Sequence, residues 1–307
     1  MKAKQTKIAV AQINPILGDL MKNLSLHEQL VEKARQEGAN IIIFPELSLT
    51  GYFVKDLVPA LALNRQSPHL DRLKRLSSDI SIVLGLVEES SDYRFFNSAF
   101  LLEGGEVRHV HRKVYLPTYG MFDERRYFAT GCRLQAAESR WGPLGLLICE
   151  DLWHPSAAYL LSLEGMDILI TLSSSPGRGL GREAKLESVK VWESLNYTYA
   201  YLFSCFVVFA NRVGYEDGVH FWGGSEILSP SGATLARAKY HEEDFVVACL
   251  DRAELRRERA TSPLLRDECP DLVQRELTRI LTDRMKKTDL CRERKGEAKE
   301  SHGADAP

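Results

Sequence analysis

Three side chains that can carry out covalent chemistry together each follow a short apolar run of the sequence. They are Glu46, Lys113 and Cys149, and each stands within two positions of the end of its run. A thiolate is a strong nucleophile, a nearby ammonium favours that form of the thiol, and a carboxylate can accept the thiol proton and return it later. Lys113 and a backbone N–H near Glu150 could stabilise the oxyanion formed when the thiolate attacks an amide carbonyl.

Taken singly, each of these residues also has a structural interpretation. A cysteine at the end of a buried strand is usually an inert small hydrophobe, a glutamate can pair or cap near a strand end, and a lysine can be a solvated charge. Their shared position supports chemistry, because side chains at the carboxyl ends of strands in an α/β sheet can meet at one edge. The pattern therefore predicts that the trio converges.

The elements that would position these residues are short apolar or β-branched runs that alternate with amphipathic stretches. Strands are expected over Ile8–Ile13, Ile41–Phe44, Ile80–Val87, Phe96–Leu102, Glu106–His111, Leu144–Ile148, Asp167–Leu172 and Phe206–Asn211. Helices are expected around residues 24–34 and over Ser156–Leu163 and Arg182–Tyr199. Two strand pairs leave no room for a helix and are predicted hairpins: Phe96–Leu102 with Glu106–His111, and Glu226–Ser229 with Thr234–Ala238. Helices and hairpins together predict a layered α/β domain with mixed sheets.

Several sequence blocks around the trio resemble the signatures of a known enzyme family. The blocks are Phe44–Tyr52, Leu116–Phe128 and Ile148–Trp153, with the segment around Lys113. They are similar to the nitrilase, or carbon–nitrogen hydrolase, superfamily, and most resemble the glutaminase domain of glutamine-dependent NAD synthetases. The similarity runs from Lys7 to about Asp251. It implies a nitrilase-like α-β-β-α sandwich and a Glu46, Lys113, Cys149 catalytic triad that works through a thioester.

The same resemblance suggests supporting residues. Glu124 matches a second glutamate of the family, which would position Lys113 or the substrate, and Glu150 lies next to the expected oxyanion site. Tyr119 and Phe122 resemble residues that line the glutamine pocket of the synthetase relatives. The structural alternatives are an exposed charge for Glu124 and core packing for the two aromatic residues.

The loop from Ser175 to Arg182 departs from those relatives. They use a serine before a proline and a nearby arginine to hold the α-amino acid end of glutamine. Here the loop is slightly longer and offers two candidates, Arg178 and Arg182, either of which could bind a substrate carboxylate in a bidentate manner. The loop lacks the Gly-Lys-Ser/Thr ending of a phosphate-binding loop. The sequence therefore leaves open whether glutamine is a substrate.

The favoured function is an amidase that converts a primary amide to a carboxylic acid and ammonia. Alternatives are a nitrilase that attacks a nitrile with the same cysteine, an N-acyl transferase, and an ammonia-supplying, glutaminase-like subunit of a separate synthetase. No segment resembles the ATP-binding domain of the synthetases, so the chain is not expected to make NAD by itself. The family resemblance implies a homodimer or higher oligomer that pairs through Ser156–Leu163 and Arg182–Tyr199.

Composition excludes other classes of protein. With 44% hydrophobic residues, 27% charged residues and a formal net charge of −2, the chain lacks the basic excess of a nucleic-acid binder. Its apolar stretches are too short for a membrane span, and its six scattered cysteines suit reduced thiols in the cytoplasm. His109 and His111 share one side of a strand without a third ligand, so no metal or cofactor is expected.

Three regions are expected along the chain. Residues 1–260 would form the carbon–nitrogen hydrolase domain, and residues 261–285 a helical extension. Residues 286–307 are rich in Lys, Arg, Glu, Gly and Ala, and this composition predicts a disordered tail.

Overall fold

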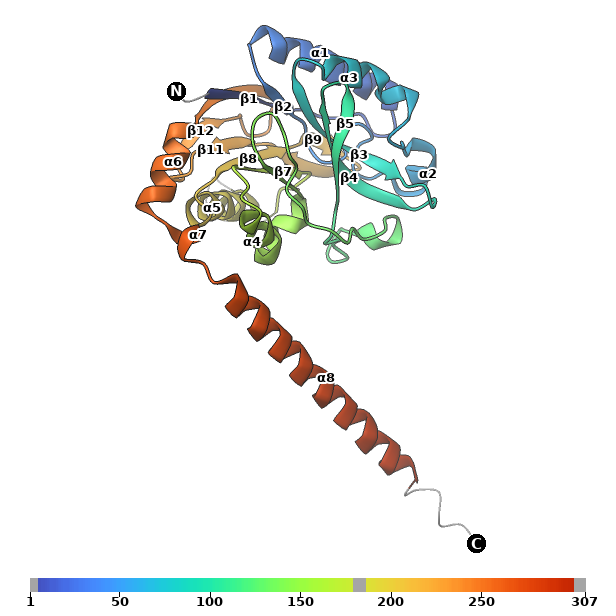
Figure 1. Ribbon diagram of the computed structural model, residues 1–307. Helices are drawn as coiled ribbons and strands as arrows, with labels where there is room; N and C mark the ends of the chain where they lie inside the picture. The colour runs from blue at the N-terminus through green and yellow to red at the C-terminus, as the bar shows by residue number, and fades with distance from the viewer. Residues whose placement is uncertain (1–4, 179–185, 301–307) are drawn as a thin grey trace. The chain divides into compact units, whose positions relative to one another are not determined.

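Two β-sheets lie face to face in the computed structural model of the protein, which describes residues 5–178 and 186–300, with side chains to residue 286 (Figure 1). The first sheet has the strand order β13-β1-β2-β3-β4-β5. Its strands are β13 (Asp244–Asp251), β1 (Gln5–Gln12), β2 (Ile41–Ile43), β3 (Ser81–Glu89), β4 (Phe95–Glu103) and β5 (Glu106–Arg112). β1, β2 and β3 are parallel, whereas β13 and β4 are antiparallel to their neighbours. The sheet is therefore mixed.

The second sheet has the order β12-β11-β8-β7-β6. Its strands are β12 (Thr234–Arg237), β11 (Glu226–Leu228), β8 (Phe206–Asn211), β7 (Ile168–Ser173) and β6 (Leu144–Ile148). β6, β7 and β8 run parallel, and β11 and β12 form an antiparallel hairpin at one edge. A separate two-stranded ribbon joins β9 (Val213–Glu216) to β10 (Val219–Trp222).

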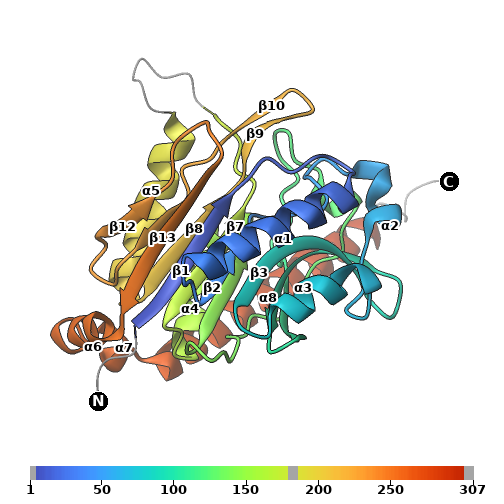
Figure 2. The same cartoon turned by 90° about the horizontal axis from the view of Figure 1, so that it is seen from above.

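Helices cover the outer face of each sheet, as Figures 1 and 2 show. α1 (Leu20–Gln36) and α3 (Asp71–Leu76) lie over the first sheet, and α4 (Pro155–Leu163) and α5 (Glu187–Leu202) over the second. The short helix α2 (Val58–Leu61) precedes α3, and α6 (Arg252–Thr261) follows β13. The α-β-β-α sandwich with mixed sheets predicted from the sequence is confirmed.

Alternation along the strands explains the layers. Ile41 and Ile43 belong to the core between the sheets, with Leu146 and Ile148 of β6, whereas Ile42 packs in the core under α1. Successive side chains of a strand point to opposite faces. β2 is apolar at every position because both of its faces are covered.

The C-terminal residues form a separate unit from Arg266 onward. It contains the end of α7 (Leu264–Asp267) and one helix, α8 (Pro270–Glu300). α8 continues beyond residue 285, where the sequence predicted that disorder begins. Lys, Arg, Glu and Ala are good helix formers, so a segment with few apolar residues can still be helical. Residues 301–307, also assigned to that tail, lie outside the described residues.

None of the helices in the described part of the chain combines the length and the apolar character needed to cross a membrane.

Candidate active site

Glu46 follows β2 and is held by three hydrogen bonds. Its Oε1 accepts from Lys113 Nζ at 2.7 Å and from Asn97 Nδ2 at 2.8 Å. Its Oε2 accepts from the backbone N–H of Ser174 at 2.8 Å. The residue is 1% exposed. A carboxylate fixed in this way can exchange protons only with groups in a defined direction, as a general base requires.

The backbone around Glu46 passes directly over β3 at Gly85. A Cβ atom on Gly85 would lie 2.4 Å from the Leu47 nitrogen and 2.6 Å from the Pro45 oxygen. No side chain fits at such distances, so glycine lets the Glu46 segment approach the sheet closely. The glycine in the middle of β3 is therefore part of how Glu46 is positioned.

Lys113 follows β5, and its ammonium lies between two carboxylates. Nζ donates to Oε1 of Glu46 and to Oε1 of Glu124, at 2.7 Å in each case. Burial disfavours the charged amine, but the two carboxylates outweigh burial and hold the pKa of Lys113 well above its ordinary value. Lys113 is therefore a constant positive charge in the site.

Cys149 follows β6 and begins a short 3-10 helix, Cys149–Trp153. Its φ of 44° lies in the left-handed region, which residues with a side chain seldom adopt. Burial, and next the charge of Glu46, raise the pKa of the Cys149 thiol more than Lys113 lowers it. The sequence predicted that Lys113 favours the thiolate. In the folded site the neutral thiol is favoured, because burial disfavours the thiolate and the charge of Glu46 adds to that effect.

Glu124 lies in the 3-10 helix Glu124–Arg126 and shares Lys113 with Glu46. Its Oε1 also accepts a hydrogen bond from the Tyr52 hydroxyl at 2.5 Å, whereas Oε2 has no partner among the described residues. Burial raises the pKa of the Glu124 carboxyl to about 7, although Lys113 opposes this shift. Glu124 therefore changes protonation near neutral pH, and its buried position excludes the exposed-charge alternative.

We expect Glu124→Gln to remove a pH dependence of the free energy of unfolding. An unfolded glutamate has a pKa of about 4.3, below the folded value of about 7. The stability from this group is complete below about pH 4.3 and is lost as the pH rises through about 7. Urea unfolding near pH 5 and pH 8, about two units below and one unit above neutrality, should show wild type losing stability relative to the variant as the pH rises. If the free energy of unfolding of wild type, relative to that of Glu124→Gln, stayed constant or rose with pH, the expectation would be contradicted.

Three residues of this network were not singled out from the sequence: Tyr52, Asn97 and Ser174. Asn97 gives the clearest signal, because a polar residue in the apolar run Phe96–Leu102 needs a buried partner. Ser174 donates its backbone N–H to the Glu46 carboxylate and its hydroxyl to the Glu46 backbone oxygen at 3.1 Å. Glu46 is 128 positions away, so the segment around Ser174 does not indicate this partner.

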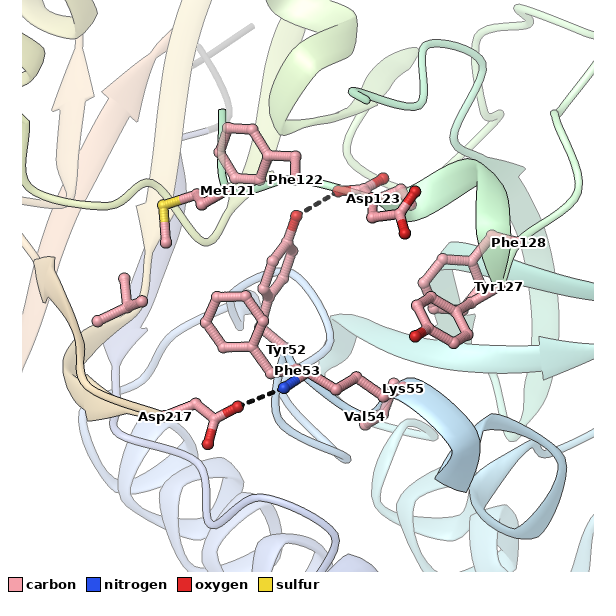
Figure 3. Close-up of a pocket in the computed structure, with 12 residues that line it drawn as sticks. Tyr52, Phe53, Val54, Lys55, Met121, Phe122, Asp123, Tyr127, Phe128 and Asp217 are labelled. Atoms are coloured by element: carbon pink, nitrogen blue, oxygen red, sulfur yellow. Dashed lines mark hydrogen bonds and ion pairs between the residues drawn. The ribbon is translucent and has the colours of Figure 1, made fainter. Parts of the chain in front are cut away.

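A cavity of about 320 Å³ adjoins the contact between Tyr52 and Glu124, both of which line it (Figure 3). Much of its lining is aromatic, from Tyr52, Phe53, Phe122, Tyr127 and Phe128. Lys55 and Asp217 also line it and form an ion pair at 2.6 Å, seen in Figure 3 on the side away from Phe122. A mostly apolar hollow with a few polar groups is typical of small-molecule sites. Cys149 is not among its lining residues, so the cavity meets the catalytic network through Tyr52 and Glu124.

The residues expected to bind substrate fall into two groups. Phe122 lines the cavity, and the guanidinium carbon of Arg178 lies 4.7 Å from the centroid of the Phe122 ring. The Tyr119 hydroxyl donates a hydrogen bond to Glu150 at 2.9 Å. By contrast, Ser175 is buried, and its hydroxyl accepts a hydrogen bond from Trp222 Nε1 at 3.2 Å. Arg182 lies outside the described residues.

Within residues 5–178 and 186–286, no three His, Cys, Asp or Glu side chains are grouped so that they could hold a metal ion. His111 is buried and bonds to Asp151 at 2.8 Å, whereas burial lowers the pKa of His109 to about 4.

Residues 7–260 match the carbon–nitrogen hydrolase family. Glutamine-dependent NAD(+) synthetase of Thermotoga maritima is 32% identical over 256 residues, which cover 82% of this chain and 43% of that protein. N-carbamoylputrescine amidase of Solanum tuberosum is 27% identical over 298 residues, which cover 91% of this chain and 97% of that protein. The chain thus spans less than half the length of the synthetase.

The fold also matches solved structures. A crystal structure of a carbon–nitrogen hydrolase from Helicobacter pylori has a TM-score of 0.76 and 24% sequence identity, with 89% of this chain and 98% of that chain covered. The shared fold therefore extends over nearly the whole of that neighbour.

Proposed function

The chain belongs to the carbon–nitrogen hydrolase family of the nitrilase superfamily, and from this premise we propose that it is an amidase. It would hydrolyse a primary amide to a carboxylic acid and ammonia. The observation that carries the proposal is the buried pair of Glu46 and Lys113, whose charges both act on the Cys149 thiol. The S. tuberosum relative is named as an amidase and aligns over almost its full length, which favours an amide over a nitrile.

In the proposed first half-reaction, Glu46 accepts the thiol proton as Cys149 Sγ attacks the amide carbonyl carbon. Because the resting thiol is neutral, proton transfer and attack belong to the same step. The carbonyl oxygen becomes an oxyanion, which Lys113 and the backbone N–H of Glu150 stabilise. Glu46 then gives its proton to the departing nitrogen, the C–N bond breaks, and ammonia leaves behind a thioester.

In the second half-reaction, Glu46 removes a proton from a water molecule that attacks the thioester carbonyl. The C–S bond breaks, the proton returns to the Cys149 sulfur, and the acid leaves. Glu124 would hold Lys113 in place, and the acyl group would extend toward the aromatic cavity and Phe122. Arg178 is positioned to bind a carboxylate on that group, if the substrate carries one.

Ammonia release from a panel of amides tests this proposal. The panel should include glutamine, short aliphatic amides, aromatic amides and N-carbamoyl amines, with the matching nitriles assayed in parallel. We expect turnover of at least one amide. Exclusive turnover of nitriles would establish the nitrilase alternative, and no ammonia from any compound would refute both.

A second candidate is an ammonia-supplying subunit for a separate synthetase. The similarity to the T. maritima synthetase, confined to 43% of that protein, favours it. A partner that co-purifies with the chain and raises its release of ammonia from glutamine would support this function. Full activity of the isolated chain on a different amide would count against it.

We also propose that two copies pair through α4 and α5. Both helices expose apolar side chains, including Leu160 at 46% and Tyr201 at 45%. Exposed apolar residues on helices suit a protein interface. Light scattering should give the mass of a dimer or a larger multiple for wild type and a lower mass for Leu160→Glu/Tyr201→Glu. Met21→Glu, at an exposed position on α1, should leave the mass unchanged; equal masses for all three proteins would contradict the proposal.

A further inference from the structure

Asp151 is a buried carboxylate in the turn that carries the nucleophile. It stands two residues after Cys149 in the 3-10 helix Cys149–Trp153 and is 0% exposed. A carboxylate without solvent contact is costly unless several donors satisfy it. Its partners therefore show which parts of the chain depend on it.

Four groups bond to this carboxylate. Oδ1 accepts from the backbone N–H of Val114 at 3.0 Å and of Tyr115 at 2.9 Å. Oδ2 accepts from the backbone N–H of Ile148 at 3.0 Å and from His111 Nε2 at 2.8 Å. Three of the donors thus come from the segment that carries Lys113, and the fourth from the residue just before Cys149.

We propose that Asp151 is a positioning residue that fixes the Cys149 turn against the Lys113 segment. Lys113 follows the first sheet and Cys149 follows the second, so no strand pairing joins the two segments. One carboxylate connects them: Oδ1 accepts from the Lys113 segment alone, and Oδ2 accepts from both Ile148 and His111. The distance from the nucleophile to the ammonium, and through Lys113 to Glu46, is set by this connection.

The backbone at Cys149 needs such a constraint. Its φ of 44° is unfavourable for a residue with a side chain and persists only where the surroundings hold it. Asp151 holds the turn from within, because its side chain reaches back to Ile148. A shift of even about 1 Å between reacting groups can lower a rate about 100-fold.

Asp151→Asn tests the role, since asparagine keeps one acceptor oxygen and puts an NH₂ group where the second was. The probe is iodoacetamide, and the readout is the rate of alkylation at Cys149, measured by peptide mass spectrometry with Cys149→Ala as the blank. We expect alkylation to slow by about 10- to 100-fold. In turnover of any accepted amide, kcat should fall with little change in KM.

Glu103→Gln is the matched control. Glu103 is also buried and accepts from Ser81 and the Arg140 backbone, but it lies at the far end of β4 from Asn97. Both variants should lose thermal stability, whereas only Asp151→Asn should slow Cys149. If Asp151→Asn is destabilised like the control and alkylates at the wild-type rate, the positioning role is overturned.

A second pair of variants tests the positioning role if Asp151→Asn does not fold. His111→Gln retains an N–H donor at about the reach of Nε2, whereas His111→Ala removes it. Alkylation should be slower in His111→Ala than in His111→Gln, and wild-type rates in both would overturn the proposal. Because alkylation needs no substrate, a chain that hydrolyses no amide would refute the amidase proposal and leave this test intact.

Discussion

Cys149→Ala should abolish hydrolysis, with kcat lowered by at least about 10⁴-fold. The thiol forms and breaks the covalent bond to the acyl group, and no other described group of the network is a nucleophile of that kind. Alanine keeps the small side chain in the same turn, so folding should be preserved. Ammonia release measures the loss, and intact mass after quenching should show an acyl adduct on wild type alone.

Cys205→Ala is the control for this experiment. Cys205 is also buried, and its thiol donates a hydrogen bond to the backbone oxygen of Tyr199 at 3.8 Å, away from the catalytic network. This variant should retain turnover and the acyl adduct. An adduct that persists in Cys149→Ala, or maps to another cysteine, would refute the assignment of the nucleophile.

Lys113→Met should remove activity and destabilise the fold together. The substitution keeps the length of the side chain but leaves Glu46 and Glu124 buried without their shared cation. Removing one partner of a buried ion pair typically costs about 3–5 kcal/mol of unfolding free energy. Loss of one oxyanion donor alone lowers kcat by about 10²–10³-fold. Urea unfolding and ammonia release measure the two effects.

The loss of stability should depend on pH. Without Lys113 the pKa of Glu124 rises further, so the variant should be less destabilised in acid, where the carboxyl is protonated, than in alkali. Lys55→Met provides the control, because that exposed lysine pairs with exposed Asp217 and should add little stability. Equal destabilisation by the two substitutions, or a loss that is greater in acid, would contradict this account.

The catalytic trio could be predicted because its signals are local. Apolar runs identify strands, and a reactive residue just after a run lies at the sheet edge where ligands bind. Tyr52 could not be found in this way, since its partner Glu124 is 72 positions away and neither segment indicates the other. The charge balance at Cys149 also depends on tertiary structure, because the sequence does not say how many carboxylates surround the thiol.

β13 was not among the strands expected from the sequence, although Phe245 to Leu250 form a run of six apolar residues. It is a strand because it pairs along its whole length with β1, from Gln5 opposite Asp251 to Gln12 opposite Asp244. Its residues favour a strand, but they do not indicate β1, at the start of the domain, as the pairing partner.

The pairing of β1 with β13 also bears on how the protein is made. β1 leaves the ribosome well before β13, which is hydrogen-bonded to one of its edges, so the first sheet stays incomplete until Asp251 has been synthesised. At 5–20 residues per second, the edge of β1 is open for roughly 12–50 s. During that time it could pair with another nascent chain.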